Sequence, residues 1–273
     1  MADQLDRRAA RSRSSEGGVG ETISVIVQAL LIALVIRTFL FQPFNIPSGS
    51  LIPTLLVGDY LFVSKYSYGY SRYSIPFSPP LFSGRIMGSQ PKRGDIIVFK
   101  LPSDNETDYI KRLVGLPGDR IQMIDGVLHI NGKAVKKERV GDYVVNDGFS
   151  RPQPVPMYRE TMPEGVSYNV IEASGDSSIF DNTREFVVPP GHFFMMGDNR
   201  DNSLDSRDMS PSGVGYVPYD NLVGRGEIIF FSFDYGRVLR YDSANRPVFE
   251  YSAWQIWNWP TQLRLGRFFM PVK

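Results

Sequence analysis

Residues 23–41 read ISVIVQALLIALVIRTFLF, and this apolar run divides the chain into two unlike parts. Four polar residues interrupt it, of which only Arg37 is charged. At about 1.5 Å per residue, a helix of this length just spans a hydrocarbon core of about 30 Å. Arg37 lies about one turn from the end of the run, where its long side chain can reach the interface. We therefore predict a transmembrane anchor over residues 21–41.

The alternative reading of this run is a cleavable signal peptide. Such a segment has an apolar core of about 7–15 residues followed by a cleavage site of small residues. Here the run is longer, and Gln-Pro-Phe-Asn follows it. Both differences favour an uncleaved anchor.

The segment before the anchor predicts how the chain is oriented. Residues 1–20 are rich in Arg, Ser and Gly, and they lack the apolar groups needed for a packed structure. They also carry a cluster of arginines, whereas residues 42–64 carry no Lys or Arg. The positive-inside rule then places a flexible tail, residues 1–20, in the cytoplasm and everything after the anchor outside it.

Composition excludes several classes of protein. The chain has 273 residues, 42% of them hydrophobic and 22% charged, which is typical of globular domains rather than disordered ones. A net charge of +1 gives no electrostatic reason to expect nucleic-acid binding. The absence of cysteine excludes disulfides and thiolate chemistry. We expect no metal and no cofactor, and we expect a monomer.

Beyond the anchor, short apolar runs separated by turn residues predict a mostly β fold with an antiparallel sheet. One run ends in Asn131-Gly132, a pair that favours a type I′ hairpin turn. Residues 66–91, rich in Tyr, Ser, Pro and Gly, predict an extended loop. We expect a catalytic β domain over residues 42–119 and 190–273, with residues 120–189 as an inserted β-rich subdomain.

Ser50, in the sequence Pro47-Ser48-Gly49-Ser50 just past the anchor, is a candidate nucleophile. A serine needs a base within hydrogen-bonding reach, and the two histidines, His129 and His192, both lie in contexts typical of structural residues. The remaining base is a neutral lysine, which requires a pKa lowered from about 10.4 to about 7–8 by burial. Lys111 follows Tyr109 and Ile110 in a strand-like segment, although lysines are more often exposed or ion-paired.

Four ordered motifs follow the anchor: FNIPSGSLIPTL at residues 44–55, RGDIIVF at 93–99, YIKRLVGLPGD at 109–119 and GDNRDNSLDSR at 197–207. Together they resemble the signature segments of bacterial type I signal peptidases. The resemblance covers most of the chain beyond the anchor. It implies a peptidase of the bacterial inner membrane that cleaves exported preproteins after small residues of the Ala-x-Ala type, with its catalytic domain on the extracytoplasmic side.

The resemblance also implies roles for individual residues. Ser50 is the nucleophile, Lys111 is the general base, and the Ser48 hydroxyl joins the Ser50 backbone N–H in the oxyanion hole. Ser203 orients the Lys111 amino group, supported by an ion pair between Asp205 and Arg207. The substrate is a signal peptide bound as an added strand, and the expected pocket walls are Phe44, Ile46, Pro47, Leu51, Leu55, Leu61, Val98, Tyr109 and Ile110.

The sequence departs from the family at Leu51, where methionine is usual, a nearly volume-conserving difference. Unlike some relatives, it also offers one span and no cysteine. Two other readings stay open: a Ser–Lys protease of another branch, either self-cleaving or dedicated to a specialised substrate, and an anchored β scaffold that binds peptides without cutting them.

The C-terminal region is ambiguous on composition alone. All three tryptophans, Trp254, Trp257 and Trp259, precede the basic residues Arg264 and Arg267. This combination favours the lipid headgroup region, and we expect the bilayer to be a partner of the protein. The alternative, that these residues belong to an ordinary aromatic core, is equally consistent with the composition.

Overall fold

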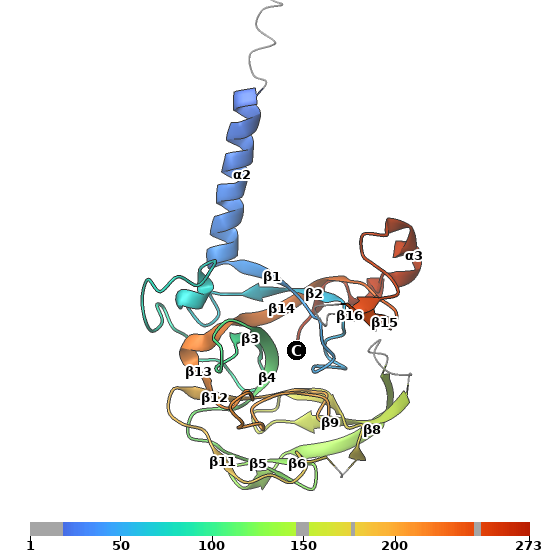
Figure 1. Ribbon diagram of the computed structural model, residues 1–273. Helices are drawn as coiled ribbons and strands as arrows, with labels where there is room; N and C mark the ends of the chain where they lie inside the picture. The colour runs from blue at the N-terminus through green and yellow to red at the C-terminus, as the bar shows by residue number, and fades with distance from the viewer. Residues whose placement is uncertain (1–18, 146–152, 176–177, 243–246) are drawn as a thin grey trace, which may run out of the picture.

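The computed structural model describes residues 19–145, 153–175, 178–242 and 247–273. Its most conspicuous element is helix α2, Val19–Phe39, which rises away from a β-rich body (Figure 1). No residue of α2 is buried, and among the described residues it is the one helix long and apolar enough to cross a bilayer. The helix lies two residues earlier than the predicted anchor. The tail predicted for residues 1–20 falls almost wholly outside the described residues.

Leu40 alone separates α2 from the first strand, and this joint is held on several sides. The Tyr70 hydroxyl donates a hydrogen bond to the Phe39 carbonyl at 2.9 Å, and the Tyr70 and Phe39 rings meet edge to face at 5.6 Å. The Lys65 backbone N–H donates to the Leu40 carbonyl at 3.0 Å. The helix therefore continues into the body without a flexible linker.

The body is built on a bulged antiparallel sheet of eight strands, so the predicted mostly β class is confirmed. Seven strands lie in the order β1-β2-β14-β3-β4-β12-β13, and an eighth, β17, pairs with β14. Their bounds are β1 Phe41–Asn45, β2 Asp59–Ser64, β3 Ile96–Lys100, β4 Asp108–Gly115, β12 His192–Met196, β13 Val217–Pro218, β14 Leu222–Ser232 and β17 Met270–Pro271. Strand β1 forms one edge of this sheet.

Both faces of the sheet centre are covered, which explains its continuous apolar runs. In β3, Ile96 and Val98 pack into one hydrophobic cluster, whereas Ile97 and Phe99 pack into another on the opposite face. All four are at most 2% exposed. A strand buried on both faces needs no polar alternation, because neither face meets water.

The described residues between 120 and 187 include the strands of two smaller sheets, which lie beneath the main one (Figure 1). One has the order β11-β5-β6-β7 and the other the order β10-β9-β8. Their bounds are β5 Arg120–Ile124, β6 Val127–Ile130, β7 Lys133–Ala134, β8 Lys136–Val145, β9 Gln153–Thr161, β10 Ser167–Ile171 and β11 Phe186–Val187. Between β6 and β7, Asn131 and Gly132 have φ of 53° and 76°, which confirms the predicted hairpin turn.

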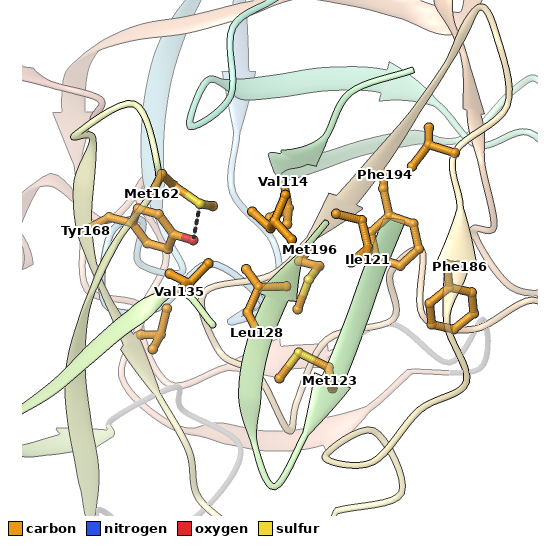
Figure 2. Close-up of a cluster of buried hydrophobic side chains, with 13 residues drawn as sticks. Val114, Ile121, Met123, Leu128, Val135, Met162, Tyr168, Phe186, Phe194 and Met196 are labelled. Carbon is orange, nitrogen blue, oxygen red and sulfur yellow. Dashed lines mark hydrogen bonds between the residues drawn. The ribbon is translucent and has the colours of Figure 1, made fainter. Parts of the chain in front are cut away.

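A shared hydrophobic cluster joins these smaller sheets to the main one (Figure 2). Met123 and Leu128 from β5 and β6 pack together with Val114, Phe194 and Met196 from β4 and β12. The inserted segment is therefore packed onto the strand that carries Lys111. Its division from the rest as a separate subdomain stays a prediction.

The remaining elements are short. They are η1 Arg72–Ser74, η3 Tyr219–Asn221, β15 Val238–Tyr241, β16 Pro247–Phe249, η4 Ile256–Asn258, α3 Trp259–Gln262 and η5 Leu265–Arg267. The predicted loop over residues 66–91 holds only η1 and a single bridge between Tyr70 and Ile86. Trp254 and Trp257 are 91% and 73% exposed, so neither belongs to a core, whereas Trp259 packs against Phe231.

Candidate active site

Ser50 and Lys111 come together although 61 residues separate them. Lys111 is the fourth residue of β4, and Ser50 lies in the turn that follows β1. The Lys111 amino group donates a hydrogen bond to the Ser50 hydroxyl oxygen, with 2.5 Å between Nζ and Oγ. The two residues are only 4% and 7% exposed. The candidate nucleophile and the candidate base are thus in direct contact, and both side chains are largely shielded from solvent.

Burial lowers the pKa of Lys111 from 10.5 to about 8. The negative charges of Asp205 and Asp198 oppose this shift, and the positive charge of Arg207 adds to it. Desolvation dominates because an ammonium group loses its hydration in the interior. The amino group can therefore release its proton closer to neutral pH than a free lysine can.

The segment Gly197–Arg207 packs against this pair. The Asp205 carboxylate pairs with Arg207 at 2.9 Å, with both side chains at most 1% exposed, and it accepts a hydrogen bond from the Gly197 backbone N–H at 3.0 Å. Burial alone would raise the pKa of Asp205, but the charge and hydrogen bonds of Arg207 lower it below its usual value. The predicted ion pair is present.

The Ser203 hydroxyl is buried, and within the described part of the chain it has no hydrogen-bond partner. It lies beside Gly197, because a Cβ built there would approach the Ser203 hydroxyl to 2.2 Å and the Ser50 carbonyl oxygen to 2.5 Å. The hydroxyl is therefore close to the Ser50 turn and free to form a bond. Its role in orienting Lys111 stays a prediction.

The structure adds residues to the site that the sequence reasoning missed. Asn199 holds the Ser50 turn twice: its backbone N–H donates to the Ser50 carbonyl and its side-chain amide to the Gly49 carbonyl, each at 3.1 Å. Arg112 pairs with Asp198 through two hydrogen bonds of 2.7 Å. The Thr54 hydroxyl also donates to Asp198 at 2.5 Å. These residues fix the nucleophile's turn against β4.

A cleft of about 570 Å³ opens beside Ser50 and Lys111. It is lined by Pro47, Ser48, Gly49, Ser50, Thr107, Asp108, Tyr109, Ile110, Lys111, Asn202 and Leu204. Ser48 is exposed in this wall, and its predicted role as an oxyanion donor stays a prediction. Along β4, pairing with β12 covers Arg112, Leu113 and Gly115 only, so residues 108–111 have an unpaired edge on that side.

Of the predicted pocket residues, only Pro47, Tyr109 and Ile110 line this cleft. Phe44 packs against the hydrophobic cluster behind it, and the other five belong to the buried residues of that same cluster: Ile46, Leu51, Leu55, Leu61 and Val98. Sequence reasoning did not identify five lining residues: Gly49, Thr107, Asp108, Asn202 and Leu204. All five lie within the quoted motifs or close to them, but nothing in the sequence shows which residues face the cleft.

Both histidines lie outside the cleft lining, and each bonds to local backbone. The Nδ1 atoms of His129 and His192 lie 2.9 Å from the carbonyl oxygens of Val127 and Pro190, respectively. The residues that the structure describes include no cluster of three or more potential metal ligands.

Comparison with known proteins shows which family this chain belongs to. The family model for signal peptidase, peptidase S26, matches residues 19–231. The chain belongs to this signal peptidase family. Its relatives include signal peptidase I of Rickettsia typhi, 45% identical over 210 residues, and that of Rickettsia conorii, 43% identical over 210 residues. Each of these alignments covers 74% of this chain and 76% of the relative.

A solved structure of a signal peptidase I from Enterococcus faecalis V583 is also similar, with 26% identity and a TM-score of 0.28. That alignment covers 50% of this chain and 97% of the other. Family membership identifies this chain as a peptidase. Its apolar helix α2 is consistent with a membrane-anchored member of the signal peptidase family.

Proposed function

We propose that this protein is a membrane-anchored serine endopeptidase that removes signal peptides from exported preproteins. The observation that carries the proposal is the 2.5 Å contact between the buried Lys111 amino group and the Ser50 hydroxyl. Family membership gives the reaction class, which is hydrolysis of a peptide bond. The contact supports a Ser–Lys mechanism, because a neutral amine beside a hydroxyl group can activate that hydroxyl for attack.

Acylation begins when neutral Lys111 accepts the proton of the Ser50 hydroxyl. The Ser50 oxygen attacks the scissile carbonyl carbon, the carbon–nitrogen bond breaks, and the departing amine takes the proton from Lys111. Lys111 then deprotonates a water molecule, which attacks the ester, and Ser50 recovers its proton. The Ser48 hydroxyl and the Ser50 backbone N–H stabilise the negative charge that develops on the carbonyl oxygen in both steps.

The cleft accounts for recognition of an extended peptide with small side chains. The unpaired edge of residues 108–111 can accept a substrate strand, because an added strand satisfies free backbone groups. Tyr109, Ile110 and Pro47 form apolar walls close to Ser50. Large side chains next to the scissile bond would collide with these walls, so we propose cleavage after Ala-x-Ala-type sequences.

Orientation follows from the arginines that precede α2. We propose that the N-terminus lies in the cytoplasm of a bacterial cell and that the catalytic body lies on the outer side of the plasma membrane. The protein would act there as a monomer on preproteins whose own apolar segment is still in the bilayer.

The test is cleavage of a purified preprotein by the full chain in liposomes, with the new N-terminus identified by mass spectrometry. Ser50→Ala and Lys111→Arg should each abolish cleavage, the latter because a guanidinium does not lose its proton in a protein. Thermal unfolding of each variant in detergent checks that it is folded. Turnover near that of the wild type in either folded variant would refute the Ser–Lys mechanism, and a folded wild type that binds preprotein without cutting it would indicate a scaffold.

A further inference from the structure

A second hollow, which we name the apolar groove, lies between α2 and the segment 70–87. It encloses about 880 Å³. Leu34, Val35, Thr38 and Phe39 of α2 form one wall. The facing wall consists mainly of apolar side chains from residues 70–87, among which Phe77 and Met87 are 103% and 79% exposed. A surface of this kind is unfavourable in water unless something apolar covers it.

The position of the groove places it at the membrane surface. Its α2 wall is the last two turns of the helix, on the side where the chain enters the β body (Figure 1). If α2 spans the bilayer, these turns lie at the extracytoplasmic end of the hydrocarbon core. The groove therefore opens towards lipid at the level where a signal peptide's apolar segment ends.

A buried lysine, Lys65, is bonded to the groove wall, and its charge interacts with that of a residue in the cleft. The Lys65 amino group, 1% exposed, donates a hydrogen bond of 2.5 Å to the carbonyl of Ser74, which lines the groove. Asp108, which lines the cleft, attracts Lys65, and Arg37 near the end of α2 repels it.

We propose that the apolar groove binds the apolar membrane segment of the signal peptide while its cleavage site occupies the cleft at Ser50. This inference rests on the proposed function. The chain's own course from α2 through β1 to Ser50 shows that a membrane helix followed by an extended segment can reach the nucleophile from this level. A signal peptide has the same order of parts, an apolar core and then a short segment ending in small residues.

Charge complementarity favours a peptide helix over a lipid chain in this groove. A helix that ends at the extracytoplasmic surface leaves its last carbonyl groups unpaired and carries partial negative charge there. Arg37, in the last turn of α2 at this end of the groove, supplies a matching positive charge. A fatty acyl chain has no such charge at the same depth.

The first experiment fills the groove from the helix side. Val35→Trp places a large apolar side chain in the groove, and Ile36→Trp makes the same change at a neighbouring position that does not line it. Both full-length variants in liposomes are assayed on a preprotein and on a short soluble peptide that spans only the cleavage site. We expect Val35→Trp to lower the ratio of the two kcat/KM values, preprotein to peptide, by roughly tenfold, the value of one buried apolar side chain. Ile36→Trp should leave the ratio unchanged.

The outcomes separate this inference from the proposed function. A wild type that cuts neither the preprotein nor the short peptide refutes the proposed function itself. A short peptide that is cut, with equal ratios for the two tryptophan variants, refutes the groove alone. An equal loss on both substrates caused by Val35→Trp would indicate a lipid-filled structural groove and would likewise refute the inference.

The second experiment measures proximity directly and uses the absence of cysteine from the chain. Val35→Cys is combined with Ser50→Ala, so that the preprotein is not consumed, and a single cysteine is introduced into the preprotein's apolar segment. Oxidation should form a mixed disulfide with Val35→Cys and much less with Ile36→Cys. Equal yields from the two positions, or none from either, would overturn the proposal.

Discussion

Lys111 is buried, and in the proposed mechanism it must carry a proton for part of the catalytic cycle, which burial disfavours. Burial lowers its pKa to about 8, so the neutral form predominates above that pH and the ammonium below it. We expect kcat/KM for a short peptide to rise with pH and to reach half its maximum near pH 8. A pH profile measured in detergent checks this. Half-maximal activity near pH 10 would contradict a desolvated base.

The same burial predicts that Lys111 destabilises the folded protein. Below pH 8 the group is charged in both states, and the folded state alone loses hydration, at a cost of about 3 kcal/mol for a pKa lowered by about 2.5 units. Lys111→Met should therefore unfold at a higher temperature than the wild type at pH 7. The difference should shrink as pH rises from 8 to 10.5, because the folded protein no longer holds a proton that the unfolded chain still binds. Unfolding of both proteins at several pH values measures this, and a less stable variant at pH 7 would refute it.

Ser203 offers a test that separates function from stability. Its hydroxyl is buried and lacks a hydrogen bond among the described residues, so removing it breaks no existing bond. We expect Ser203→Ala to retain the wild-type unfolding temperature or to exceed it. If the hydroxyl orients Lys111 during catalysis, kcat should nevertheless fall by about tenfold or more. Unchanged kcat and an unchanged pH profile would show that Ser203 has no positioning role.

Two glycines allow a turn beside Ser50 to be compared with a turn outside the site. A Cβ at Gly197 would meet the Ser50 carbonyl oxygen and the Ser203 hydroxyl, whereas a Cβ at Gly132, in the β6–β7 turn, would meet nothing within 4 Å. We expect Gly197→Ala to displace the Ser50 turn and to abolish most peptide cleavage. Gly132→Ala should cost about 1 kcal/mol of stability because of its positive φ and should leave activity intact. Parallel assays of cleavage and thermal unfolding compare them, and equal activities would contradict the assigned role of Gly197.

The elements differ in how well sequence predicts them. The hairpin at Asn131-Gly132, the strand carrying Lys111 and the apolar helix each follow from local patterns, and the structure contains all three. The Arg112–Asp198 pair could not be predicted in this way, because the two residues are 86 positions apart and meet only when β4 and the Gly197–Arg207 segment are assembled. For the same reason, the sequence did not separate residues that line the cleft from those buried behind it. Which face of β1 and β2 points inwards depends on sheet packing.

Across the whole molecule, apolar surface is exposed at the level of α2 and also at the C-terminal turns. Trp254 and Trp257 lie near η4 and α3, which rise on the same side of the body as α2 (Figure 1). We expect these tryptophans to enter the lipid headgroup region. Because the chain has only three tryptophans, intrinsic fluorescence reports on this region directly. Brominated lipids in liposomes should quench the wild type strongly.

The matched control removes the exposed rings and keeps the packed one. The double variant Trp254→Phe and Trp257→Phe retains Trp259, whose ring lies 5.8 Å from that of Phe231. Its remaining fluorescence should be quenched much less than that of the wild type. Equal fractional quenching of the two proteins, or no quenching of either, would show that the exposed tryptophans do not meet the bilayer.

The joint at Leu40 has a mechanical consequence. Helix α2 passes into β1 with a single intervening residue, and Tyr70 and Lys65 donate hydrogen bonds to the junction, so we expect the helix and the body to move together. A membrane helix adapts to a thinner or thicker bilayer chiefly by tilting. A change in tilt would then move the cleft at Ser50 relative to the lipid surface. We therefore expect the thickness of the host membrane to influence the rate of cleavage, to an extent that depends on how stiff this one junction is.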